Sequence, residues 1–330
     1  MTGERLGKVH EAALDYEGVA DAADRITRNV ARAVTGKRDS IELAVAAMLA
    51  GGHVLVEDVP GVGKTLLARS LARCVEAKFR RIQFTPDLLP GDVTGLTVYD
   101  RGSSGFEFWP GPVFANVVLA DEINRASPKT QSALLEAMGE GAVTVDGETR
   151  RLPQPFCVIA TQNPVEQAGT YRLPQAELDR FMIKMDLGYP DAASEVELLR
   201  LPGDPVSGLS PVIGLEEFGH ITRLVREVSV SEAVLRFVVG VTSATRGHED
   251  AALGASPRAS RMLLAAAKAR AAIRGRADCL PEDVAALAPN VLAHRILPVA
   301  GWRGADRDGA GSIVQDALDS VRATAEPEQA

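Results

Sequence analysis

The segment that most constrains the fold of this chain is Asp58–Thr65, which reads DVPGVGKT. It matches the phosphate-binding pattern GxxxxGK(S/T) at every fixed position except the first, where aspartate replaces glycine. The apolar run Val54–Val56 before it predicts a short strand, and the pattern from Lys64 to Val75 after it predicts a helix. A strand, a glycine-rich loop and a helix, in that order, are the context that this motif requires. The chain is therefore expected to contain an α/β domain that binds a phosphate-bearing ligand.

Each fixed residue of this loop has a physical role in binding phosphate. Gly61 and Gly63 allow backbone N–H groups to curl around phosphate oxygens, and Lys64 supplies a cation to the β- and γ-phosphates. The Thr65 hydroxyl falls at the helix N-terminus, where it can ligate Mg²⁺. Aspartate is expected to be tolerated at position 58 because it adopts unusual φ angles more readily than most residues, although its carboxylate would lie near the phosphates. The predicted nucleotide contacts are Pro60, Gly61, Val62, Gly63, Lys64, Thr65 and Leu66.

Two carboxylates follow the apolar run Val117–Ala120, which predicts a parallel strand covered by helices on both faces. Ligands of open α/β sheets bind at the carboxyl ends of strands, which is where Asp121 and Glu122 fall. We expect Asp121 to hold the Mg²⁺ hydration shell and Glu122 to orient the attacking water. A second apolar run, Phe156–Ala160, leads to Asn163, which can reach a γ-phosphate or that water. Taken singly, these patterns are also typical of polar strand ends and turns, and the loop alone could be a turn that binds nothing. Together they predict ATP hydrolysis.

Length and composition place these motifs in an ordinary globular protein of 330 residues, 46% hydrophobic and 24% charged. Residues 202–211, PGDPVSGLSP, form a linker by composition, and only helical patterns follow it. The predicted fold class is α/β: a P-loop core with a parallel sheet flanked by helices over residues 1–200, then a small all-helical lid over 201–330. The tail from Gly304 onward has one weak helical stretch. Further expected elements are helices over residues 20–34, 41–50, 216–228, 232–244, 258–273 and 282–292, and strands over 79–84 and 181–187.

Charge and cysteine content argue against several other classes of protein. The net charge of −8 works against a non-specific binder of polyanions. Cys74, Cys157 and Cys279 form no CxxC pair, so neither a disulfide framework nor a zinc site is indicated, and a reducing cytoplasm fits best. The longest uncharged stretch, Leu43–Val56, is too short to span a bilayer, and no targeting signal is recognised. A cytoplasmic protein without a transmembrane segment is therefore expected.

Five motifs occur in a set order along the chain. They are the phosphate loop, DEINRA (Asp121–Ala126), ATQNP (Ala160–Pro164), LDRF (Leu178–Phe181) and SPRA (Ser256–Ala259). In combination, over about residues 15–300, they resemble the MoxR family of AAA+ ATPases. The resemblance implies that Arg180 acts as an arginine finger on the γ-phosphate bound by a neighbouring subunit, and that Arg258 is a second sensor carried on the lid. The alternatives are a salt bridge of Arg180 with Asp179 or Glu177, and a solvated helix arginine at position 258.

The same resemblance implies that the chain binds ATP and Mg²⁺. It also implies assembly into a ring, which is expected to be a hexamer. The implied clients are proteins, including a partner with a von Willebrand factor A domain. Residues 94–110 and 142–152 resemble insertions of that AAA+ subgroup, which lie around the central face of the ring. The second reads as a β-hairpin, because Asp146-Gly147 favours a tight turn. Trp109 is interpreted as a packing anchor rather than a substrate contact. A second departure from the family pattern, besides Asp58, lies near Val34–Lys37, where the family usually has a similar Val/Gly segment beside adenine.

Three other functions use a similar catalytic layout. A nucleic-acid motor is disfavoured, because Asp146 and Glu148 near the hairpin tip and Glu107 opposite Arg101 would repel a polyanion, so no nucleic acid is expected. A nucleotide-switched scaffold is disfavoured by the intact acidic pair that ends the Val117–Ala120 run. A magnesium-chelatase-type motor subunit remains open, since it shares the catalytic residues and also works with a von Willebrand factor A partner.

Overall fold

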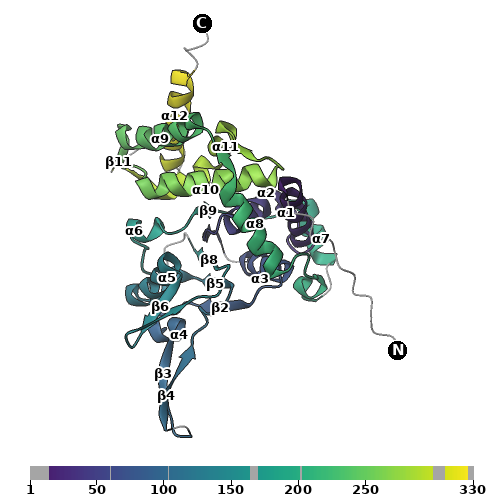
Figure 1. The fold of residues 1–330 in the computed structure, drawn as a ribbon, viewed down its shortest axis with the longest axis vertical. Helices are drawn as coiled ribbons and strands as arrows, with labels where there is room; N and C mark the ends of the chain where they lie inside the picture. Colours follow the sequence, from purple (N-terminus) through teal and green to yellow (C-terminus); the bar gives the residue numbers. More distant parts are fainter. Residues whose placement is uncertain are drawn as a thin grey trace, which may run out of the picture.

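A computed structural model describes residues 15–59, 61–102, 104–163, 170–200, 203–299 and 309–325. At its centre lies a five-stranded sheet in the order β2-β5-β8-β1-β9 (Figure 1). Every pair of neighbouring strands in this sheet is parallel. All five strands that the sequence predicted for the sheet are confirmed: β1 (Val54–Glu57), β2 (Phe79–Gln83), β5 (Val117–Asp121), β8 (Cys157–Gln162) and β9 (Ile183–Met185).

Helices cover both faces of the sheet, as the continuous apolar runs of the strands require. Alternate residues of β1 enter two separate cores, since Val54 and Val56 belong to one and Leu55 to the other. All residues of β5 are buried, which explains why VVLA shows no polar alternation. The first core includes α1 (Tyr16–Ala31), α2 (Arg38–Leu49) and α3 (Lys64–Cys74), and the second includes α5 (Pro128–Glu140) and the short α4 (Pro90–Thr94).

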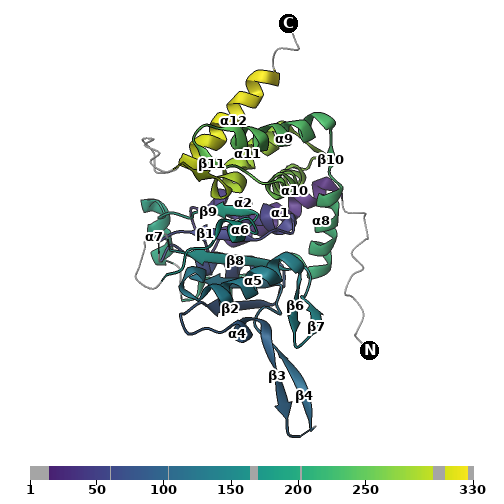
Figure 2. The same cartoon turned by 90° about the vertical axis from the view of Figure 1, so that its left-hand side faces the viewer.

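A helical lid, defined here as α8 to α12, follows the core, and its helices α9 to α12 lie at the opposite end of the molecule from β3 (Gly95–Asp100) and β4 (Gly105–Pro110) (Figure 2). The helices α1 and α2 pack against α10, and one continuous core joins them to the sheet and the lid. The lid also contains two short strand pairs, so the prediction of an all-helical lid was wrong in this detail. The division at residue 200 stays a prediction. The lid elements are α8 (Leu215–Glu227), α9 (Glu232–Gly247), α10 (Pro257–Ile273), α11 (Pro281–Leu292) and α12 (Gly309–Ala325), with β10 (Ser229–Val230) paired to β12 (Asp278–Cys279) and β11 (Ala251–Leu253) to β13 (Leu297–Pro298).

The regions of the predicted linker and of the tail contain more helix than the sequence indicated. Before the linker, α7 (Ala192–Arg200) forms a helix that was not predicted, and η2 (Pro205–Gly208) lies within the linker itself. In the tail, α12 runs for 17 residues and packs against α9, whereas only a weak helical stretch was expected. Its apolar residues Ile313, Val314, Ala317 and Leu318 are buried, and this burial stabilises a helix whose own signal is weak.

Both predicted insertions fold as antiparallel hairpins. β3 (Gly95–Asp100) pairs with β4 (Gly105–Pro110), and this hairpin projects away from the body in both views (Figures 1 and 2). β6 (Ala142–Val145) pairs with β7 (Glu148–Arg151), and the turn residues Asp146 and Gly147 have φ angles of 53° and 80°. These positive angles are those of the tight turn that Asp-Gly favours, which confirms the predicted hairpin.

Trp109 is not the packing anchor that the sequence suggested, since it is 58% exposed on β4. The neighbouring Phe108 has that role: its ring lies 5.6 Å from the ring of Phe114 in a T-shaped contact, and the guanidinium of Arg150 lies 4.1 Å above it. Because successive strand residues point to opposite faces, only one of the two adjacent aromatic residues can face the body of the protein. Among the described residues, no helix is long and apolar enough to cross a membrane.

Candidate functional site

The phosphate loop lies between the end of β1 and the start of α3, where the sequence predicted it. Gly61 and Gly63 have φ angles of +89° and +99°, which L-residues with a Cβ rarely adopt. An added Cβ would meet no atom within 4 Å at either position, so both glycines are required by backbone conformation, and the space above the loop is open. Lys64 Nζ donates a hydrogen bond of 2.6 Å to the carbonyl oxygen of Asp58, which closes the loop.

Asp58 does not occupy the loop in the way that the sequence suggested. Its φ angle is not positive, and its carboxylate binds backbone N–H groups. Oδ2 accepts from the N–H groups of Leu187 and Gly188, at 2.8 and 2.7 Å, and Oδ1 accepts from Val59 at 2.7 Å. The side chain is buried. Aspartate therefore stands here because it ties the start of the loop to the segment that follows β9, and tolerance of an unusual φ angle is not the reason.

Asp121 and Glu122 lie at the carboxyl end of β5 and are joined through Thr161 of β8. The Thr161 hydroxyl donates to Asp121 Oδ1 at 2.6 Å and accepts from the Glu122 N–H at 2.9 Å. Thr161 is fully buried, so this hydroxyl holds both residues in register. Glu122 has φ 56° and ψ 49°, a left-handed conformation that costs a non-glycine residue about 1–2 kcal/mol. Thr161 was not predicted, because a threonine within a strand carries no local signal of this contact.

Three further polar residues hold the two carboxylates from outside. Arg81 of β2 donates to Asp121 Oδ2 at 2.6 Å, the oxygen that Thr161 does not use. Glu122 Oε2 accepts from Arg125 of η1 (Ile123–Arg125) at 2.8 Å and from Gln83 at 3.2 Å. A cation bound by Asp121 would compete with Arg81 for Oδ2. Both carboxylates are therefore oriented by hydrogen bonds from within the chain.

One cavity of about 390 Å³ brings the separate motifs together. Eight of the predicted residues line it: Gly61, Gly63, Lys64, Thr65, Leu66, Asp121, Glu122 and Asn163. Val62 packs partly against the core instead, and Pro60 lies outside the described residues. Arg69 of α3 also lines the cavity and was missed; its guanidinium pairs with Asp204 of the linker at 2.6 Å.

The cavity places Lys64 in a partly buried and acidic setting. Burial lowers the pKa of the Lys64 ammonium, and the charges of Asp58, Asp121 and Glu122 act in the opposite direction. Thr65 and Asp121 supply a hydroxyl and a carboxylate, the hard oxygen donors that Mg²⁺ prefers. Within the described parts of the chain, no group of three or more histidine, cysteine or acidic side chains could hold a metal by itself. The donor set thus fits Mg²⁺ that is bound jointly by protein and nucleotide phosphates.

Arg180 and Arg258 do not line this cavity. Arg180 follows α6 (Gln175–Leu178) and donates to the carbonyl oxygen of Leu135 at 2.8 Å. A Cβ placed on Gly139 of α5 would lie 2.3 Å from Arg180 NH1 and 4.0 Å from Arg258 NH2, so both guanidinium groups lie near Gly139. Glycine at position 139 leaves room for them.

The predicted alternative for Arg180, an ion pair with Asp179 or Glu177, is not present among the described contacts. Asp179 pairs with Arg295 at 2.7 Å, and Glu177 accepts a hydrogen bond from Ser132 at 3.1 Å. Arg258 is exposed at the start of α10, as its alternative interpretation allowed. The role of each arginine in catalysis stays a prediction.

His53 is a core histidine. Its Nδ1 accepts from the Val158 N–H at 3.0 Å, and its Nε2 lies 3.2 Å from the Met138 carbonyl oxygen. Burial lowers the pKa of its imidazole to about 4. The ring is therefore neutral near pH 7, with the proton on Nε2.

The comparisons with known proteins agree with this geometry. A family model described as "ATPase family associated with various cellular activities (AAA)" matches residues 53–183, and an AAA lid domain model matches residues 243–317. The chain is 41% identical to the chaperone MoxR1 of Mycobacterium tuberculosis, over 89% of this chain and 82% of that protein. The chain belongs to the MoxR family of AAA+ ATPases. This result favours the MoxR assignment over the magnesium-chelatase-type alternative.

Other members of the MoxR family and its structural relatives extend the likeness over nearly the whole chain. The YeaC protein of Bacillus subtilis is 48% identical over 90% of this chain and 93% of its own length. A crystal structure assigned to an ATPase of Cytophaga hutchinsonii is 37% identical, with a TM-score of 0.84, and covers 92% of this chain and 95% of that one. This MoxR-family chain therefore has the α/β core and the helical lid of its relatives.

Proposed function

We propose that this chain hydrolyses ATP with Mg²⁺ and uses the cycle to remodel or mature protein partners. The observation that carries the proposal is that Lys64, Asp121, Glu122 and Asn163, from three separate segments of the chain, line one cavity with the loop glycines. Positioning and electrostatic stabilisation supply most of the catalysis in phosphoryl transfer, so preordered charged groups around one cavity suit this reaction.

Each residue of the cavity has a part in the proposed reaction. Lys64 and the loop N–H groups bind the β- and γ-phosphates, and Thr65 and Asp121 hold Mg²⁺, which neutralises the phosphate charge. Glu122 orients and polarises the attacking water, and Asn163 contacts that water or the γ-phosphate. The Glu122 carboxylate accepts hydrogen bonds from Arg125 and Gln83, and the Glu122 backbone N–H donates to the Thr161 hydroxyl of the neighbouring strand, so the carboxylate is held in one place.

Arg180 and Arg258 are proposed to serve the site of a neighbouring subunit in a ring, which we expect to contain six copies. The two guanidinium groups lie together beside Gly139 and outside the cavity of their own chain. A pair of cations placed there would complete a site only across a subunit boundary, as an arginine finger does. ATP hydrolysis would then depend on assembly.

The proposed clients are proteins, and a partner with a von Willebrand factor A domain remains our expectation. The chaperone name of MoxR1 from M. tuberculosis supports this class of client. The β3–β4 hairpin presents exposed apolar residues, with Phe106 at 79% and Trp109 at 58% exposure, which suit a protein surface better than a polyanion. The cysteines among the described residues are free and buried, which fits our expectation of a reducing cytoplasm.

Two variants test the ATPase proposal directly. We expect Lys64→Ala to lose ATP binding, since each charge-assisted hydrogen bond contributes about 1.5–3 kcal/mol. Glu122→Gln should bind ATP normally and hydrolyse it roughly 10² to 10⁴ times more slowly. Calorimetric titration with ATP and a phosphate-release assay measure the two effects, and Lys129→Ala, an exposed change on α5, serves as the control.

Unchanged ATP affinity in Lys64→Ala would show that the loop is not the phosphate site. Near wild-type turnover in Glu122→Gln would remove Glu122 from the proposed role. If both expectations hold, the Glu122→Gln protein, which stays loaded with ATP, is the form to use for capturing clients from the native host.

A further inference from the structure

A buried ion pair joins the lid to the segment that carries Arg180. Arg295, in the short 3₁₀ helix η3 (Ala293–Arg295), has a side chain only 2% exposed, and its Nε donates to Asp179 Oδ1 at 2.7 Å. The same guanidinium also donates to the carbonyl oxygens of Phe181 and Met182. One lid side chain therefore binds both the side chain and the backbone of the turn that contains Arg180.

The other carboxylate oxygen of Asp179 binds a second lid element. Ser256, the N-cap residue of α10, donates from its hydroxyl to Asp179 Oδ2 at 3.0 Å and accepts from the N–H of Ala259 at 3.2 Å. Asp179 thus holds the start of α10 and η3 at the same time. Its side chain is 19% exposed, so both contacts lie mostly out of water.

Arg180 and Arg258, which we propose to act in trans, flank this junction. Arg180 follows Asp179 directly in the chain, and Arg258 comes two residues after Ser256. Both guanidinium groups lie near Gly139, close to the end of α5. Figure 1 shows α6 between α5 and the lid, which is where these three parts of the chain come together. A shift of α10 relative to the Asp179 turn would separate the two arginines.

We propose that Asp179 is a positioning residue that holds Arg180 and Arg258 as one unit for the neighbouring subunit's ATP. This inference rests on the proposed function, because it assumes that the arginines act in trans. Asp179 does not line the cavity at the phosphate loop, and its carboxylate acts by fixing the lid to the turn. Misplacement of a catalytic group by about 1 Å can lower a rate roughly 100-fold, so a junction of this kind has a large kinetic effect.

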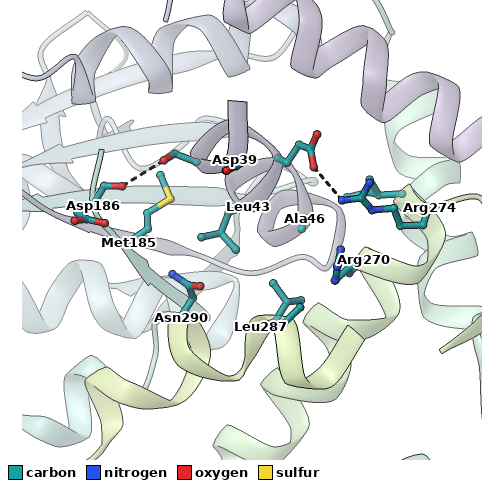
Figure 3. Close-up of a pocket in the computed structure, with 13 residues that line it drawn as sticks. Asp39, Leu43, Ala46, Met185, Asp186, Arg270, Arg274, Leu287 and Asn290 are labelled. Atoms are coloured by element: carbon teal, nitrogen blue, oxygen red, sulfur yellow. Dashed lines mark hydrogen bonds and ion pairs between the residues drawn. The ribbon is translucent and has the colours of Figure 1, made fainter. Parts of the chain in front are cut away.

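The opposite side of the boundary between core and lid is built differently. There, a cavity of about 420 Å³ is lined by residues of α2, the end of β9, α10 and α11 (Figure 3). The ion pair that crosses it, Arg274 with Glu42, spans 3.5 Å, and the Arg274 side chain is 53% exposed. Exposed pairs of this kind contribute little to orientation, whereas a buried and multiply bonded pair does hold geometry. We therefore assign the positioning role to Asp179.

The test uses Asp179→Asn, which keeps the shape of the side chain and removes its charge. We expect kcat for ATP hydrolysis to fall about 10- to 100-fold, with the KM for ATP unchanged within about twofold, because the variant's own phosphate loop is intact. Mixing Asp179→Asn with Glu122→Gln subunits should restore part of the activity. In such mixed rings, an intact Glu122 meets an intact arginine pair from the neighbour.

Two reference measurements separate this proposal from the one on which it rests. A mixture of Arg180→Ala with Glu122→Gln subunits tests action in trans by itself. Asp283→Asn is the matched control, since Asp283 is a buried carboxylate paired with Arg276 at 2.6 Å inside the lid. Asp283→Asn should lower the melting temperature. Any loss of kcat in this variant should not be restored by mixing it with Glu122→Gln subunits.

Rescue of Arg180→Ala but not of Asp179→Asn would overturn the positioning role alone, and rescue of neither would overturn the trans mechanism as well. A kcat of Asp179→Asn equal to that of the wild type would also overturn the positioning role of Asp179. If that variant does not fold, Ser256→Ala and Ser256→Thr replace it. Loss of kcat in the alanine variant and its recovery with threonine, which keeps the hydroxyl, are expected, and equal activity of the two would contradict the proposal.

Discussion

At the scale of single residues, buried hydrogen bonds explain most of the site. Thr161 joins Asp121 to the backbone of Glu122, and Glu122 stands in a left-handed conformation that only surrounding contacts can maintain. Lys64 reaches across its own loop to a carbonyl oxygen at 2.6 Å. The carboxylates are thus oriented by the Thr161 hydroxyl together with Arg81 and Arg125, and the cation by a backbone carbonyl oxygen.

The burial of His53 predicts how the free energy of unfolding depends on pH. Its imidazole pKa is about 4 in the folded protein, against 6.5 for an ordinary histidine, because it is buried. The unfolded state therefore binds more protons than the folded state between these values, and the free energy of unfolding should decrease as pH falls from about 6.5 to about 4. Burial lowers the pKa of His294 as well, so both residues act with the same sign.

Urea unfolding at pH 7 and at pH 5 measures this effect. His53→Gln loses contacts and should be less stable at both pH values, but the difference between the two free energies should be smaller than in the wild type. A pH difference that stays the same in the variant would show that His53 does not titrate as its burial indicates.

At the scale of elements, the site is assembled from the carboxyl ends of neighbouring strands. β5 brings Asp121, β8 brings Thr161, and β1 leads into the phosphate loop. Parallel strands place all these ends at one edge of the sheet, which is why motifs far apart in the sequence line one cavity. The segment after β9 joins the same edge through Asp58.

Asp58→Gly, which restores the usual first residue of the phosphate-binding pattern, is predicted to destabilise the protein. The change leaves the N–H groups of Leu187 and Gly188 without their acceptor, and each unsatisfied buried group costs about 1–3 kcal/mol. Thermal unfolding should show a melting temperature several degrees lower, and calorimetry should show no gain in ATP affinity. Asp186→Ala, an exposed change near the same segment, is the control. Tighter ATP binding at an unchanged melting temperature would refute this explanation of Asp58.

At the scale of the whole molecule, one core connects the N-terminal helices, the sheet and the lid. Since α10 packs against both α1 and α2, the lid cannot move without disturbing buried contacts of the core. The lid carries Arg258, and the turn before β9 carries Arg180, so the arginine pair belongs to this joint body rather than to the phosphate cavity.

Dependence on assembly is the prediction at this scale. If Arg180 acts on the ATP of a neighbour, the specific ATPase activity of the wild type should rise with protein concentration as rings form. Arg180→Ala should keep ATP binding and lose much of its rate, since arginine fingers contribute about 10³ to 10⁵ in rate. Steady-state assays over a dilution series, with the exposed change Arg236→Ala as control, measure both effects.

Mixed rings then decide where Arg180 acts. Combining Arg180→Ala with Glu122→Gln subunits should restore some activity, provided that the subunits exchange. If activity is independent of concentration, and a mixture shown to form mixed rings stays inactive, Arg180 has a structural role within its own chain.

The sequence by itself determined most of the residues that line the candidate site and the order in which the elements follow. The phosphate loop, the Asp121-Glu122 pair and the hairpin at Asp146-Gly147 are local patterns, and local patterns set backbone conformation within a few residues. The five strands were predictable for the same reason, since burial on both faces leaves a continuous apolar run in the sequence.

Only the tertiary structure decided how these parts meet. The Asp58 carboxylate binds a backbone N–H 129 residues away, and Arg295 pairs with a carboxylate 116 residues away. No spacing along the chain encodes such contacts, because they depend on which elements pack side by side. For the same reason the sequence assigned Trp109 to packing where Phe108 has that role, and could not tell that Arg180 and Arg258 lie together outside the cavity of their own chain.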